Sequence, residues 1–195
     1  HDTRHLCAGM LRMLLLILYC TGLRLGEAAR LQLSDIDLDQ QCFFVRESKG
    51  RSRIVPFLDD LAHELNDCLR LRQRILEVST TVDPGALLLR NSGQALSVEV
   101  ASEAIRRLLR REGLKPDRGR TGPRPYEFRH AFAVHRLTLW YREGVDIHAR
   151  LPWLSAYMGH VNVLGTQVYL RATPELMRLA SERFAWHWRH GKKTS

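Results

Sequence analysis

The residues most suited to chemistry are a histidine and a tyrosine in the last third of the sequence. His160 follows a glycine, and Tyr169 follows nine residues later. A tyrosine hydroxyl can attack a phosphodiester and hold the cleaved strand covalently, while a nearby imidazole stabilises the charge that develops. The pair also occurs by chance, and an aromatic residue after a short turn usually serves packing. The chemistry therefore requires cations elsewhere in the chain to bind the phosphate.

The composition supplies these cations, mainly as arginine. The 195 residues include 30 Lys and Arg against 21 Asp and Glu, a formal net charge of +9. A planar guanidinium can bind a phosphate group at two points at once. Nucleic acid is therefore the leading partner, with an acidic protein or a membrane surface behind it. An Arg-rich genome is the simpler alternative and accounts for part of the excess.

Several function classes find no support in the sequence. The cysteines lack CxxC spacing, which indicates neither a zinc site nor a disulfide framework and fits a reducing compartment. The histidines and carboxylates form no convincing metal set, so we expect no metal and no cofactor. The apolar run 13–20 is too short to span a bilayer, and we interpret it as a buried helix. These observations predict a cytoplasmic, nucleoid-associated protein that does not bind a membrane.

Hydrophobic periodicity predicts a mainly α protein with a small antiparallel β-sheet, an α+β fold. Strand-forming residues and a turn indicate three strands between residues 36 and 56. We expect helices at 6–20, 23–33, 57–78, 97–114, 126–143 and 147–158, and a last helix that begins at Thr173. In the helix 57–78 the predicted core stripe is Leu58, Leu61, Leu65, Leu69 and Leu76.

These elements place single basic residues at prominent positions. Arg24 lies in the first turn of a short helix, Lys49 at a hairpin tip, and Arg129 early in the helix 126–143. Each has an ordinary alternative. Arg24 and Glu27 can form an exposed pair of little energetic value, and a lysine at a hairpin tip is most often solvated.

Two further stretches are basic. Residues 106–111 carry four arginines on one helix, and the Gly- and Pro-rich loop 115–125 follows. The helix is either a solvated face or a face that tracks phosphates, and the loop is either a DNA-contacting connector or an exposed linker. The predicted DNA contacts are Arg51, Arg53, Arg107, Arg111, Arg118, Arg120 and Arg124.

Five segments taken together resemble the tyrosine recombinase (phage integrase) family, in the family's order and over nearly the whole chain. They are TGLRLGE around Arg24, SKGRSRIVPF around Lys49, YEFRHAFAVHRL around Arg129, MGH ending at His160, and TQVYL around Tyr169. The resemblance implies the fold of that family's catalytic domain. It also implies a site-specific recombinase or integrase, of the kind that a mobile element carries, that needs neither metal nor ATP.

The resemblance assigns a role to each residue. Tyr169 would attack the scissile phosphate, giving a 3′-phosphotyrosine link and a free 5′-hydroxyl. Arg24 and Arg129 would bind the non-bridging oxygens, Lys49 would protonate the leaving 5′-oxygen, and His160 would hydrogen-bond the phosphate.

One position departs from the family pattern. Tyr126 stands three residues before Arg129, where the family usually has histidine. A phenol with a pKa near 10 is a poor general base but a good hydrogen-bond donor. Deprotonation of Tyr169 then falls to His130, to water or to the phosphate. We expect slowed or altered acid-base catalysis rather than an inactive protein.

The family also suggests an architecture. Members usually carry a small DNA-clamping domain before the matched region, and nothing in this sequence corresponds to it. We therefore expect residues 1–195 to form a single catalytic domain, either a fragment or a minimal enzyme. Within it, the helix 173–190 docks on this molecule or on a neighbour. The implied assembly is a tetramer on double-stranded DNA, and a monomer when isolated.

Three other functions stay open at this point. A topoisomerase IB-like enzyme shares the same residue logic but reseals its own strand. A catalytically silent DNA-binding protein of the same fold is the second alternative, and an RNA-binding module is a distant third, because no stacking aromatic motif is evident.

Overall fold

The structure is a computed structural model, and it describes residues 6–48, 51–119, 121–160, 162, 164–167, 169, 175, 177–182 and 185. The chain divides into two compact units, His1–Arg129 and His130–Ser195. In the described part of the chain, no helix combines the length and the apolar character needed to cross a membrane.

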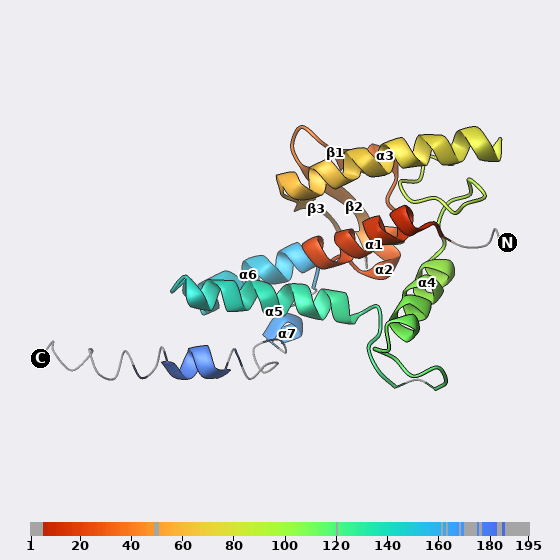
Figure 1. Ribbon diagram of the computed structural model, residues 1–195. Coiled ribbons are helices and arrows are strands. Elements are labelled where there is room, and N and C mark those ends of the chain that lie inside the picture. The colour runs from red at the N-terminus through yellow and green to blue at the C-terminus, as the bar shows by residue number, and fades with distance from the viewer. Residues whose placement is uncertain are drawn as a thin grey trace, which may run out of the picture. The chain divides into compact units, whose positions relative to one another are not determined.

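The first unit is built on the buried helix α1 (Ala8–Thr21), which packs against α2 (Leu25–Ala29), α3 (Asp59–Ser79) and α4 (Val98–Arg111) (Figure 1). Helix α1 ends at Gly22, whose φ of 63° lies in the left-handed region and whose N–H bonds to the Leu18 carbonyl. This is the stop that the Thr-Gly pair predicts, because glycine adopts that conformation at no steric cost.

Helix α2 is shorter than the helix predicted at 23–33. Beyond it the chain leaves helical geometry and pairs with the segment 85–87, through bonds from Leu33 N to Gly85 O and from Leu87 N to Leu31 O, both 2.8 Å. A one-turn 3₁₀ helix, η1 (Leu33–Asp35), follows. The prediction was wrong here because residues far along the chain offer these backbone groups better partners than another helical turn does.

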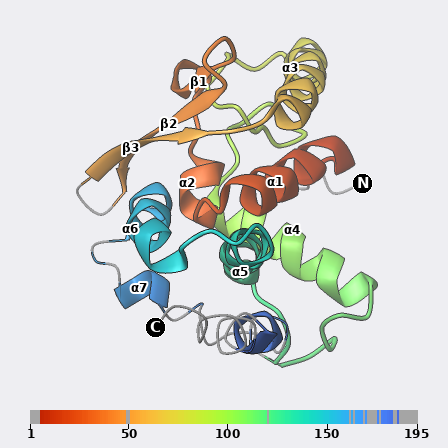
Figure 2. The same cartoon turned by 90° about the vertical axis from the view of Figure 1, so that its left-hand side faces the viewer.

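The sheet is three-stranded and antiparallel, in the order β1 (Ile36–Asp37), β2 (Cys42–Ser48), β3 (Arg51–Pro56), which confirms the predicted fold class (Figure 2). Strand alternation separates its faces. Phe43 and Val55 pair and are buried, whereas the neighbouring pair of Phe44 and Ile54 is exposed. The predicted hairpin-tip residue Lys49 lies outside the described residues.

Helix α3 buries Leu61, Leu65, Cys68 and Arg72. The prediction that Leu58 belongs to its core stripe was wrong, since Leu58 is the N-cap residue and 74% exposed. A residue at the cap precedes the helical repeat and does not share its buried face.

Arg72 is buried in the core and holds the loop after α3 by hydrogen bonds. Its Nε donates to the Ala86 carbonyl at 2.7 Å, and its Nη1 donates to Asp83 at 3.0 Å. The Asp83 carboxylate also accepts the Gly85 N–H at 2.7 Å. These hydrogen bonds lower the pKa of Asp83 below its usual value, and the bond from Arg72 has the largest effect.

The lowered Asp83 pKa predicts a stability that depends on pH. The Arg72 interaction is fully present above the unfolded-state pKa of about 4 and is lost as the pH falls through the lower folded-state value. Asp83→Asn should therefore destabilise the protein more at pH about 7 than at pH about 3, measured by urea unfolding. Asp67→Asn, at an exposed carboxylate paired with Arg70, is the matched control. An equal loss at both pH values would contradict this account.

Helix α4 begins where the sequence places its cap. The Ser97 hydroxyl accepts the Val100 N–H at 3.3 Å, and the helix buries Ala101, Ile105 and Leu109. It ends three residues before the predicted Leu114, at a turn formed by Glu112 and Gly113.

The second unit contains most of α5 (Glu127–Arg142), together with α6 (Ile147–Met158) and α7 (Leu164–Gln167). The bounds of α6 are those predicted, because Asp146 caps its first turn and Gly159 ends it. The core of the second unit consists of Phe132, Ala133, Val134, Leu137, Ile147, Leu151, Leu154, Met158 and Tyr169. The predicted helix 173–190 falls largely outside the described residues.

Candidate active site

The turn between α1 and α2 positions Arg24. The Thr21 hydroxyl donates to the Ile17 carbonyl at 2.5 Å and accepts the Leu23 N–H at 3.3 Å. Together with the left-handed Gly22, these bonds hold the chain reversal in one geometry. Arg24 then serves as the N-cap residue of α2, with an extended backbone.

Glu27 is the anionic centre of this turn. Its side chain is 2% exposed, and its carboxylate accepts the Arg24 N–H and the Arg24 Nη1 group, both at 2.8 Å. It also accepts both terminal nitrogens of Arg53, at 3.1 and 2.9 Å. The ordinary interpretation of the Arg24–Glu27 pair places it on the surface, but the structure buries the carboxylate, and buried charges require such partners.

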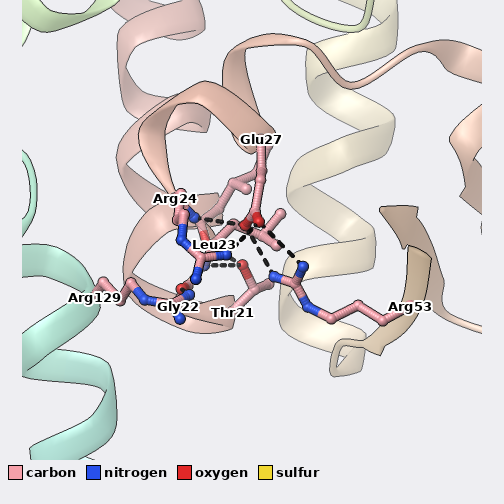
Figure 3. A network of polar contacts seen from close by, with 8 residues as sticks. Thr21, Gly22, Leu23, Arg24, Glu27, Arg53 and Arg129 are labelled. Atoms are coloured by element: carbon pink, nitrogen blue, oxygen red, sulfur yellow. Dashed lines mark hydrogen bonds and ion pairs between the residues drawn. The ribbon is translucent and has the colours of Figure 1, made fainter. Parts of the chain in front are cut away.

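Arg129 reaches the same turn from the start of α5. It is 2% exposed, and its Nη1 donates to the Gly22 carbonyl at 2.6 Å, across 107 residues of sequence. Figure 3 shows the Arg24, Arg53 and Arg129 side chains gathered around the turn, with the Glu27 carboxylate between Arg24 and Arg53. The structure thus brings together two of the residues predicted to bind phosphate.

The cluster is strongly cationic. Among the residues that the structure describes, three guanidinium groups and one carboxylate lie around this turn, an excess of two positive charges in a partly buried setting. Charge held in such a low-dielectric setting attracts an anion more strongly than charge in water. The arrangement can stabilise a phosphate and the additional negative charge that develops when a nucleophile attacks it.

In the second unit, the end of α6 orients His160. Gly159 adopts a left-handed φ of 66°, and the His160 N–H bonds to the Ser155 carbonyl at 2.9 Å, the pattern of a Schellman motif. The His160 Nδ1 lies 2.7 Å from the hydroxyl of the buried Thr166. This contact sets the orientation of the imidazole ring.

Tyr169 packs beside two histidines. The centroid of its ring lies 5.2 Å from that of His130, edge to face, and 6.2 Å from that of His160 in a stacked arrangement. The residue is 1% exposed and belongs to the core of the second unit. In this position the Tyr169 side chain is shielded from solvent.

Tyr126 lies just before α5, and its carbonyl accepts the Arg129 N–H at 3.0 Å. Its side chain is exposed, at 57%. Tyr126 and Arg129 are thus joined through the first turn of the helix, and the catalytic role predicted for Tyr126 stays a prediction.

The predicted DNA contacts have varied surroundings. Arg107 pairs with Glu103 at 3.3 Å, and Arg111 with Glu112 at 2.9 Å. Arg118 and Arg124 lie in the loop that follows α4, and both are exposed. Arg120 and the Arg51 side chain, like Lys49, lie outside the part of the chain that is described. Arg53 alone of the described set points inward, to Glu27.

Sequence reasoning assigned Glu27 no functional position and put Arg53 on the DNA surface. A signal for Glu27 was present, because an acidic residue three positions after an N-cap often accepts the cap N–H. No comparable local signal exists for Arg53, whose partner lies 26 residues away.

Comparison with known proteins agrees with this geometry. The model of the phage integrase family matches residues 1–175. The chain belongs to the phage integrase family. A putative integrase/recombinase, y4rB, from Sinorhizobium fredii is 36% identical over 88% of this chain and 54% of its own length. Tyrosine recombinase XerA from Thermococcus kodakarensis is 34% identical over the same shares, so the chain spans about half the length of these curated relatives.

Solved structures show the same fold. The crystal structure of XerA recombinase superposes with a TM-score of 0.66 at 25% identity, over 94% of this chain and 64% of that one. XerH site-specific recombinase, in a pre-cleavage complex with its difH substrate, gives a TM-score of 0.60 at 23% identity, over 83% of this chain and 42% of that one. The predicted fold, that of a tyrosine recombinase catalytic domain, is confirmed.

Proposed function

We propose that this chain is the cleaving and joining part of a site-specific DNA recombinase that works through a 3′-phosphotyrosine intermediate, without metal or ATP. The observation that carries the proposal is the convergence of Arg24 and Arg129 on the Gly22 turn, in a chain of the phage integrase family. The two arginines come from separate family-like segments, and a common phosphate ligand gives them a reason to meet.

The proposed reaction needs no external energy source, because a new phosphoester bond forms each time one breaks. The Tyr169 oxygen attacks phosphorus, the bond from phosphorus to the 5′-oxygen breaks, and Lys49 supplies the proton to that oxygen. Arg24, Arg129 and His160 stabilise the charge on the phosphate. The freed 5′-hydroxyl of a partner strand then attacks the phosphotyrosine, which restores a phosphodiester and releases Tyr169.

His130 is the base that the packing favours for the Tyr169 proton. Of the acceptors that the sequence leaves open, it is the side chain in edge contact with the tyrosine ring. A neutral imidazole can accept a phenol proton as the phosphorus bond forms.

The partner we propose is double-stranded DNA, bound by a tetramer on paired sites in the cytoplasm. The net charge of +9 and the exposed arginines of the loop 115–125 support a phosphate-rich partner. Binding by the isolated chain should weaken steeply as salt rises, because each phosphate contact releases counterions.

Covalent trapping on nicked DNA tests the proposal. End-labelled duplexes of randomised sequence carry a nick, so that cleavage beside it releases a short strand and leaves the intermediate unable to rejoin. We expect a protease-sensitive adduct on a denaturing gel, with the nucleotide on Tyr169 in the tryptic peptide 151–171. Mobility shifts without an adduct would instead support a silent DNA-binding protein. Relaxation of supercoiled plasmid with no exchange between strands would support a topoisomerase-like enzyme.

The unusual residue Tyr126 leads to a rate prediction. Tyr126→His should raise the single-turnover cleavage rate by about tenfold or more at neutral pH, because imidazole transfers protons there and a phenol does not. The exposed position tolerates the change without disturbing the core. Tyr126→Phe, which removes only the hydroxyl, is the companion variant. A Tyr126→His protein that cleaves no faster would show that this residue does not limit the rate.

A further inference from the structure

Arg53 stands out as a half-buried cation that the proposed reaction does not use. It lies on β3 opposite Val45, and its side chain is 11% exposed. Both of its terminal nitrogens bond to Glu27 in a two-point pair. Such a pair is geometrically selective, because the planar guanidinium matches the two carboxylate oxygens.

The same carboxylate is also the partner of Arg24. Arg24 Nη1 and Arg53 Nη1 both donate to Glu27 Oε1, at 2.8 and 3.1 Å. Without Arg53, the negative charge of Glu27 would directly oppose the positive charge of Arg24 where the phosphate has to bind. With Arg53 present, the charges of Arg24, Arg53 and Glu27 sum to one positive charge.

We propose that Arg53 is a positioning residue that acts through Glu27 and Arg24. It neutralises the buried Glu27 carboxylate, which frees Glu27 to hold the Arg24 turn while Arg24 keeps its attraction for the scissile phosphate. The inference rests on the proposed function, since it concerns the phosphate of that reaction. It also reassigns Arg53 from the DNA surface to the interior of the site.

The competing explanation is a brace that only ties β3 to α2. A brace depends on geometry, whereas the proposed role depends on charge, so removing both charges separates the two. In the double variant Arg53→Met/Glu27→Gln, the amide that replaces the carboxylate can still accept from Arg24 through its carbonyl oxygen but carries no negative charge. The ion pair is gone, yet Arg24 again faces no uncompensated carboxylate.

The experiment measures single-turnover adduct formation at saturating nicked duplex, using a sequence selected from the randomised pool. Arg53→Met should slow cleavage about 10- to 100-fold, the range found when partners behind a metal ligand are removed. The double variant should recover most of that loss, and Arg53→Lys should lie between Arg53→Met and the wild type. Each rate is taken below the melting temperature of its variant.

A second substrate separates two ways of slowing the reaction. A duplex with sulfur in place of the bridging 5′-oxygen has a leaving group that needs no proton. The Arg53→Met defect should persist on this duplex, because it concerns charge on the phosphate. Restoration to the wild-type rate would place the defect at the protonation step and overturn the proposal.

The remaining outcomes also support or overturn the proposed role of Arg53. A double variant as slow as Arg53→Met would overturn the charge account and leave a brace. If Arg53→Met does not fold, the double variant decides alone, since the proposal expects it to cleave within about tenfold of the wild type. Unchanged cleavage by Arg53→Met, with an active wild type, overturns this inference and spares the proposed function. A wild type that forms no adduct removes both.

Discussion

Replacing Tyr169 with phenylalanine should abolish the covalent adduct and leave the fold intact. The variant lacks the attacking oxygen, so trapping on nicked duplex should fall to background. The aromatic ring remains, and with it the packing against His130 and His160 in the core of the second unit. Loss of the buried hydroxyl should change the free energy of unfolding by no more than about 1.5 kcal/mol.

Tyr157 provides the matched control for this change. It lies on the same tryptic peptide, and its ring stacks on Phe132 with centroids 5.4 Å apart. Tyr157→Phe should therefore retain the adduct at close to the wild-type level. An adduct that survives in the Tyr169 variant would mean that another nucleophile acts, and the proposed reaction would have to be abandoned.

Replacing Arg129 with lysine should slow cleavage by about a hundredfold or more, although the charge is kept. Arg129 already donates one nitrogen to the Gly22 carbonyl. Its planar fork can hold that contact and offer further donors to a phosphate, whereas a lysine is a point charge that cannot match both directions. Losing one preorganised donor to a developing negative charge typically costs about 3 kcal/mol, which corresponds to this factor.

The measurement is again single-turnover adduct formation, together with DNA affinity. Affinity should change far less than the rate, because the donor matters most when the phosphate gains charge. Arg74→Lys, at an exposed position on α3, controls for the general effect of an Arg-to-Lys change. A rate within a few fold of the wild type would contradict the assignment of Arg129 to the phosphate.

Much of the local structure could be predicted, because its signals act over a few residues. Gly22 and Gly159 end helices in the left-handed conformation, and Ser97 and Asp146 cap the helices that follow them. The strand-forming residues of the hairpin predict its two strands, β2 and β3. Caps and strand propensity depend on neighbouring residues, so they survive whatever packs against them.

Burial and partnership were decided by the tertiary structure. Local spacing makes Glu27 one half of a surface pair, but Arg53 and the core around it enclose the carboxylate. Leu58 has the residue type of a core position, yet it lies at a cap and is exposed. Whether a side chain is buried depends on which distant segment covers it, and local spacing carries no record of that.

The candidate site divides in the same way. The sequence by itself determined the residue types and their order, including Arg24, Arg129, His160 and Tyr169, and with them the family. Only the tertiary structure placed Arg129 on the Gly22 carbonyl, turned Arg53 toward Glu27 and packed Tyr169 against two histidine rings. Residues as far apart in the sequence as Gly22 and Arg129 meet only when the helices and strands between them have packed, because no local preference acts over that distance.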